Sequence, residues 1–88
     1  MKLTDLAPSW ASADGRHGQA LSFRCPHCEE RLVVPFANPL DGGAAPAWAK
    51  GVLWQREGDT FGTLTLTPSV DSPGHWHGFV TAGEVTTC

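Results

Sequence analysis

The chain has 88 residues and a mass of 9.4 kDa, which suffices for one small domain and excludes a two-domain enzyme. Its formal net charge is −3, and only six lysines and arginines are spread along the sequence. Because a nucleic-acid backbone requires a basic surface, the charge disfavours a nucleic-acid partner. Ten glycines and seven prolines favour turns and short strands.

The N-terminus carries no pattern typical of a targeting segment. Residues 1–8 lack a basic cluster followed by an apolar run of about 7–15 residues, so no secretory signal is expected. No stretch approaches the roughly 20 apolar residues that cross a bilayer. We therefore expect a cytoplasmic protein without a membrane anchor. Disulfides are rare in a reducing cytoplasm, so metal ligation or redox chemistry must account for Cys25 and Cys28.

Residues 1–18 are predicted to form an irregular N-terminal arm, and residues 19–88 a single β-rich domain. The domain begins with alternating apolar and polar residues from Leu21 to Cys25, which is the period of a half-buried strand. Apolar residues also alternate over 32–36, and Pro35 favours an edge position for this strand. The two segments predict a hairpin.

The rest of the chain also predicts short strands. Residues 38–50 are expected to form an irregular connection, since they are rich in proline, glycine and alanine. Further strands are predicted over the following segments: 52–56, 61–67, 75–80 and 84–87. The last two are separated by a turn near Ala82 and form a C-terminal hairpin. No helix longer than a turn or two is expected.

Two short motifs have the spacing of metal ligands. Cys25 and Cys28 flank a predicted bend, where both thiolates can turn toward one ion. His75 and His77 are two residues apart on a predicted strand, so their side chains project from one face. We predict a Zn²⁺ site with these four ligands, and Cys88 is the alternative fourth ligand. Four protein ligands leave no position for substrate, so the metal is expected to be structural.

The predicted fold class is therefore a small, mainly β, zinc-ribbon-like domain in which one metal clamps two or three antiparallel hairpins. Alternatives remain at this stage. Cys25 also fits an ordinary buried thiol, and the histidines fit half-exposed strand positions beside Trp76. A Cys-Pro-His-Cys tetrapeptide also occurs in thiol oxidoreductases, although the valines and proline of 33–35 oppose the helix which that chemistry requires.

The sequence favours a protein without catalytic activity. It contains no Gly-x-Ser-x-Gly elbow, no phosphate-binding glycine loop and no pattern of paired carboxylates. Of the four tryptophans, Trp54 and Trp76 are expected in the core, whereas Trp10 and Trp48 are candidates for a protein interface. We predict a non-catalytic, zinc-stabilised module that binds another protein. The alternative is a small metal- or thiol-dependent enzyme, either a hydrolase or an oxidoreductase.

Several segments resemble a family of small phage and prophage proteins of unknown function. The resemblance covers about residues 21–85, and the turn over 66–69 followed by the strand with His75 and His77 is its most specific part. Some members are labelled "ammonia monooxygenase", a label that we treat as a misnomer because this chain lacks membrane spans and copper ligands. The resemblance implies a phage-type zinc-binding module in a bacterial host cell, with a host or phage protein as partner.

Overall fold

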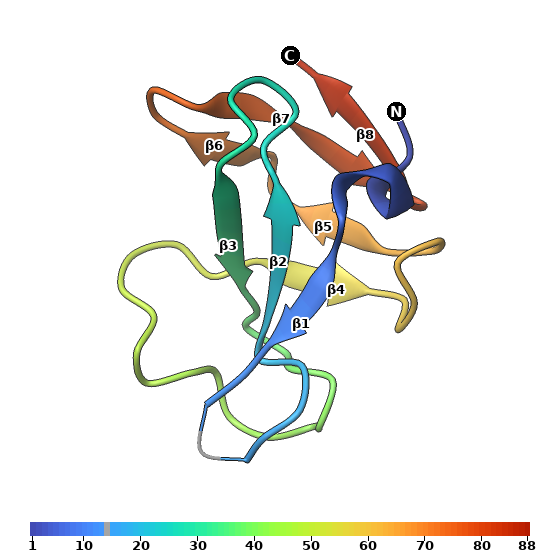
Figure 1. Cartoon of the computed structure of the whole chain (residues 1–88). Helices are drawn as coiled ribbons and strands as arrows, with labels where there is room; N and C mark the ends of the chain where they lie inside the picture. The colour runs from blue at the N-terminus through green and yellow to red at the C-terminus, as the bar shows by residue number, and fades with distance from the viewer. Residues whose placement is uncertain (14) are drawn as a thin grey trace.

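Three small antiparallel sheets make up the computed structural model of the chain, which describes residues 1–13 and 15–88 (Figure 1). The elements follow in the order η1 (Leu3–Leu6), β1 (Ser9–Ala11), β2 (Ala20–Arg24), β3 (Arg31–Pro35), β4 (Gln55–Glu57), β5 (Thr65–Thr67), β6 (Val70–Ser72), β7 (Trp76–Thr81) and β8 (Glu84–Thr87). The sheets have the strand orders β1-β2-β3, β4-β5 and β6-β7-β8. The described residues contain no α-helix, and the prediction of a small, mainly β domain is confirmed.

The first sheet contains the predicted hairpin of β2 and β3. Leu21 pairs with Val34, and Phe23 pairs with Leu32. These apolar residues are buried, whereas the intervening Val33 is 50% exposed. Period-two alternation therefore sets the register here, since a slip of one residue would expose the whole apolar set. β3 is an outer strand of its sheet, as Pro35 predicts.

The third sheet has a strict division between its two faces along β7. Trp76, Gly78 and Val80 are buried, and the residues between them point outward. Gly78 lies against the indole of Trp76 and the carbonyl oxygen of Thr86, and a Cβ at this position would collide with both. The Trp76 side chain consequently fills the inner side of β7, and the residues on the outer side are exposed to solvent.

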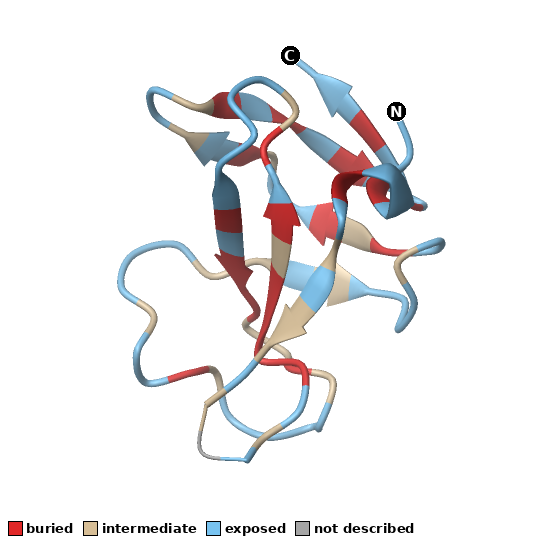
Figure 2. Ribbon diagram, viewed as in Figure 1, coloured by how far each residue is buried: buried red, intermediate tan, exposed pale blue. Residues whose placement is uncertain are grey.

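The hydrophobic core lies where the first and third sheets face each other. Figure 2 shows buried residues recurring along β2, β3 and β7, whereas β8 buries only Val85. Phe23 and Trp76 meet edge to face, with ring centroids 6.0 Å apart, and thereby join the two sheets. The Trp76 indole also donates a 3.0 Å hydrogen bond to the hydroxyl of Thr87. Trp76 is therefore fixed by its apolar surface and by its polar group.

The N-terminal segment is irregular only in part. Leu3 and Leu6 of η1 are buried in the core, and β1 pairs with β2 over Ser9–Ala11. Residues before η1 also bridge to β8, through the pair Lys2 and Glu84. Elements of three or four residues leave too short a pattern for a hydrophobic period, which is why the sequence analysis predicts an irregular arm.

In the middle of the chain, too, short elements differ from the prediction. The strand expected over 61–67 is reduced to β5, because residues 60–63 form a turn closed by the Thr63 amide and the Thr60 carbonyl. β6 was absent from the prediction because Val70–Ser72 is only three residues long. Trp54 is partly buried, so only Trp76 of the two expected core tryptophans is fully in the core.

Across residues 1–13 and 15–88, none of the helices has the length and apolarity needed to span a bilayer.

The contact between Phe23 and Trp76 predicts the effect of a core truncation. Replacing Phe23 with alanine should lower the free energy of unfolding by about 3–5 kcal/mol, because the fully buried ring leaves a cavity between two sheets. Urea denaturation followed by tryptophan fluorescence measures this change. Val33→Ala on the exposed side of β3 is the control and should change stability by less than about 0.5 kcal/mol. Equal effects of the two substitutions would contradict this description of the core.

Candidate functional site

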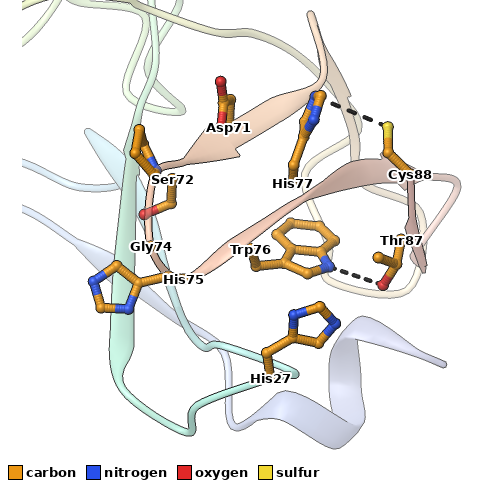
Figure 3. Close-up of a pocket in the computed structure, with 10 residues that line it drawn as sticks. His27, Asp71, Ser72, Gly74, His75, Trp76, His77, Thr87 and Cys88 are labelled. Carbon is orange, nitrogen blue, oxygen red and sulfur yellow. Dashed lines mark hydrogen bonds between the residues drawn. The ribbon is translucent and has the colours of Figure 1, made fainter.

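Two separate groups of polar side chains, each with one histidine from residues 75–77, lie beside a cavity of about 330 Å³ (Figure 3). The cavity is lined by the turn between the two strands, by His27 from the loop that joins β2 to β3, and by the chain end at Thr87 and Cys88. The site therefore combines segments that are distant in sequence.

The local backbone places His75 and His77 in different surroundings. His75 lies in the turn, where its amide donates a 2.9 Å hydrogen bond to the carbonyl of Ser72. Gly74 in this turn has φ +81°, a left-handed conformation that glycine adopts without steric cost. β7 begins only at Trp76, and so the alternation of side chains applies to His77 and not to His75.

The first group consists of Cys28, Glu30 and His75. The Sγ atom of Cys28 is 3.1 Å from Nδ1 of His75, and a carboxylate oxygen of Glu30 is 3.5 Å from the same nitrogen. One ligand atom from each residue lies within 4.8 Å of the other two, so this group could hold a metal ion. It joins the loop between β2 and β3 to the turn between β6 and β7.

Cys25 supports this loop from the buried side. Its amide donates a 2.7 Å hydrogen bond to the Glu30 carbonyl, and its own carbonyl accepts from the Glu29 amide at 3.1 Å. The His27 amide donates to the Cys25 sulfur at 3.4 Å. Amide donors around a cysteine sulfur stabilise its thiolate, as a metal-binding knuckle requires.

The two cysteines of the loop differ in acidity. Burial opposes ionisation of Cys25, but the amides of Cys28 and His27 outweigh it, and the pKa of Cys25 is lowered. At Cys28 the Glu30 amide favours the thiolate, yet the hydrogen bond to Cys25 and partial desolvation prevail and raise its pKa. Of the two thiols, Cys25 therefore has the greater tendency to ionise.

The second group lies on the outer face of the third sheet. Nε2 of His77 is 3.2 Å from the Ser69 hydroxyl and 3.8 Å from the Cys88 sulfur. Asp71 is the register partner of His77 across β6 and β7, and both residues are exposed. Figure 3 shows His77 turned toward Cys88 and away from His75. A hydroxyl beside an imidazole is the arrangement in which histidine activates serine as a nucleophile.

The structure thus distributes the predicted metal ligands over two places. Cys28 and His75 lie together, Cys25 adjoins them, and His77 belongs to the other group with Cys88. Sequence reasoning missed Glu30 and Ser69. Glu30 follows Cys28 by two residues, a spacing that could have marked it. Ser69 ends the turn over 66–69 on which the family resemblance rests, and this was the available signal.

The two predicted interface tryptophans also differ. Trp48 is 43% exposed, and its indole donates a 3.3 Å hydrogen bond to the Gln19 side chain. Trp10 is partly buried against the core, and its ring stacks on Phe61 with centroids 4.4 Å apart. Trp48 therefore presents more surface to a partner than Trp10 does.

Comparison with known proteins identifies one family. A family model described as "Bacterial ubiquitination-like system serine protease (BubE)" matches residues 3–88. No curated protein and no solved structure matches the chain. The family description names an enzyme, so the prediction of a non-catalytic module is wrong, and its alternative of a thiol- or metal-dependent enzyme is not confirmed. Assigning both histidines to one metal concealed the pairing of His77 with Ser69. No comparison tests the resemblance to phage proteins, which stays a prediction.

The knuckle loop yields a prediction about stability. Glu29 has φ +64°, a left-handed conformation that costs an L-residue roughly 1–2 kcal/mol. Glu29→Gly should therefore raise the free energy of unfolding by about 1 kcal/mol, measured by urea denaturation. Glu29→Ala also removes the carboxylate but keeps a Cβ, so it should give little or no gain. If alanine stabilises as much as glycine, charge rather than backbone conformation is responsible.

Proposed function

The chain belongs to the BubE family, and on this premise we propose that it is a serine hydrolase with Ser69 as nucleophile and His77 as general base. The observation that carries the proposal is the 3.2 Å separation between the Ser69 hydroxyl and Nε2 of His77. A serine hydroxyl is a weak nucleophile unless a base within hydrogen-bond distance accepts its proton. Serine proteases are recognised by this geometry whatever the order of residues in the sequence.

The proposed reaction has two stages. The Ser69 oxygen bonds to the carbonyl carbon while its proton passes to Nε2 of His77, and the imidazolium then donates that proton to the leaving amine as the C–N bond breaks. Water next attacks the acyl-serine ester and gives a proton to His77. The ester bond breaks, the proton returns to the Ser69 oxygen, and the carboxylic acid leaves.

Asp71 is the carboxylate that assists this pair in the proposal. As the cross-strand partner of His77 on the same face, it has its Cβ atom about 5 Å from that of the histidine. In the proposed reaction its negative charge lies on the same face as the positive charge that the imidazole gains on proton transfer and offsets part of it. In the proposal Asp71 therefore acts through its charge alone, as a carboxylate on the same face as the base.

The substrate class follows from the family description and from the exposure of the site. A ubiquitination-like system works on proteins, so we infer a protein substrate whose peptide or isopeptide bond reaches the serine. His77 lies on an exposed strand face, which a macromolecule can approach, and Trp48 offers additional contact surface. A protein substrate made in the bacterial cell agrees with the cytoplasmic location expected from the sequence.

We also propose that the first group binds Zn²⁺ in a structural role. Cys28, His75 and Glu30 supply sulfur, nitrogen and oxygen donors of the kind that zinc accepts. We assign Cys25, which adjoins them in the same loop, as the fourth ligand in this proposal. An ion there would cross-link the loop after β2 to the turn before β7. By the closure-entropy estimate for cross-links, an ion that joins Cys28 to His75 adds roughly 4 kcal/mol to the free energy of unfolding.

Substitution of the proposed nucleophile and base tests the enzyme directly. Ser69→Ala and His77→Ala should each lower hydrolysis of an activated ester by at least about 100-fold, because each removes the nucleophile or its base. Labelling by a fluorophosphonate probe, located by mass spectrometry, should occur on Ser69 and disappear in both variants. Ser72→Ala and Cys88→Ala are the controls and should retain labelling. Labelling that survives Ser69→Ala, or that requires Cys88, would refute the assignment.

The separation of the two histidines gives a test of the metal. His75→Ala should lose bound zinc, measured by elemental analysis, and its melting temperature should fall by more than about 8 °C, since 1 kcal/mol corresponds to about 4–8 °C in a domain of this size. His77→Ala should keep its zinc and its melting temperature while losing hydrolysis. A chelator should reproduce the His75→Ala result in the unsubstituted protein. Loss of zinc in His77→Ala, or stability unaffected by chelation, would overturn the zinc proposal.

A further inference from the structure

Phe79 is a large apolar residue on the same face as the proposed catalytic pair. It follows His77 by two residues on β7, where outward and inward positions alternate strictly. Its side chain is 45% exposed, whereas the inward neighbours Gly78 and Val80 are buried. A phenyl ring on the outer face of a small sheet keeps its apolar surface in water, which is unfavourable unless something else covers the ring.

The sheet register places Phe79 directly beside the nucleophile. Val70 pairs with Gly78, and extending this antiparallel register by one residue sets Ser69 opposite Phe79. Residues opposite each other on neighbouring strands have Cβ atoms about 5 Å apart. Ser69 lies just before β6, so this extended register sets its Cβ atom near that of Phe79, while its hydroxyl lies 3.2 Å from Nε2 of His77 on the diagonal.

Phe79 has no aromatic partner in the part of the chain that the structure describes. The ring contacts found among residues 1–13 and 15–88 involve Trp10, Phe23, Phe36, Phe61 and Trp76. On β8 the register partner of Phe79 is Thr86, which is exposed. Because the buried residues of β7 point to the opposite face, the exposed ring is open to a molecule that approaches Ser69.

The chemistry of the pair determines which part of a substrate meets this ring. His77 must donate a proton to the leaving amine, so the leaving segment lies toward His77. The residue that supplies the carbonyl then lies on the other side of Ser69, toward Phe79. We propose that Phe79 selects an uncharged, apolar side chain on the acyl side of the bond to be cleaved, an inference that rests on the proposed hydrolase.

The surroundings of the ring support this preference. An aliphatic side chain packed on a phenyl ring removes apolar surface from water on both sides. A carboxylate in the same place would lose hydration without a partner and would also be repelled by Asp71, which lies on the same face. We therefore expect kcat/KM to be highest with leucine, lower with glycine and lowest with aspartate as the residue that supplies the carbonyl.

The experiment compares short amide substrates that differ only in the residue preceding a fluorogenic leaving amine, with leucine, glycine or aspartate at that position. The variants are Phe79→Ala and the more conservative Phe79→Leu, and Thr81→Ala is the matched control one step further along the same face. The ratio of kcat/KM for leucine over aspartate should fall at least about tenfold in Phe79→Ala, through KM, and be retained in Phe79→Leu and Thr81→Ala. The rate of Ser69 labelling by a small fluorophosphonate should stay within about threefold of the unsubstituted protein in all three variants, because the probe lacks that side chain.

The two proposals fail in different ways. An unchanged leucine preference in Phe79→Ala, with Ser69 still labelled, would overturn the role of Phe79 and leave the hydrolase intact. Labelling that falls together with hydrolysis in Phe79→Ala and Phe79→Leu would show that the ring supports the catalytic pair instead of selecting substrate. Absence of Ser69 labelling in the unsubstituted protein would overturn the hydrolase, and the role of Phe79 with it.

Discussion

The burial of Trp76 against Phe23 is the contact on which the arrangement of the site depends. The indole fills the inner side of β7, meets Phe23 edge to face and donates a hydrogen bond to Thr87. It is also the first residue of the strand, and both of its neighbours in sequence are histidines. With Trp76 held inward, His77 must point outward, and His75 is left in the turn beside Cys28. One apolar contact therefore separates two polar groups that are close in sequence.

The sequence predicts those parts of the fold that have a long enough pattern. Leu21, Phe23 and Val34 alternate with exposed residues, and this alternation identifies the first hairpin and its buried face. β1 and β6 have three residues each, too few for a period, and their existence depends on pairing with longer neighbours. The local sequence pattern is sufficient to predict a strand that has its own buried face. It is insufficient to predict a short strand that forms only because it pairs with a longer neighbour.

The site shows the same limit more sharply. A pair of cysteines with two residues between them predicts a sulfur-rich bend, and the structure places Cys28 beside His75 there. The prediction fails to separate His75 from His77 because it extends the strand one residue too far. Ser69 and His77 come together across a hairpin, and no spacing rule connects a serine that follows a proline to a histidine on the next strand. Family membership supplied what the pattern lacked, since it directed attention to a serine with a base beside it.

Gly78 lies between the two outward residues His77 and Phe79, and on its inner side there is no room for even a methyl group. The inward residues of β7 are thus limited by the space available in the core, whereas the outward residues His77 and Phe79 are not. A substitution at the outward position Phe79 leaves this packing unchanged, whereas any side chain at position 78 must displace the Trp76 indole or the backbone of β8. Exchanging β7 between homologues would keep His77 and Phe79 in their outward positions only if Phe23 of β2, which packs against Trp76, were exchanged as well.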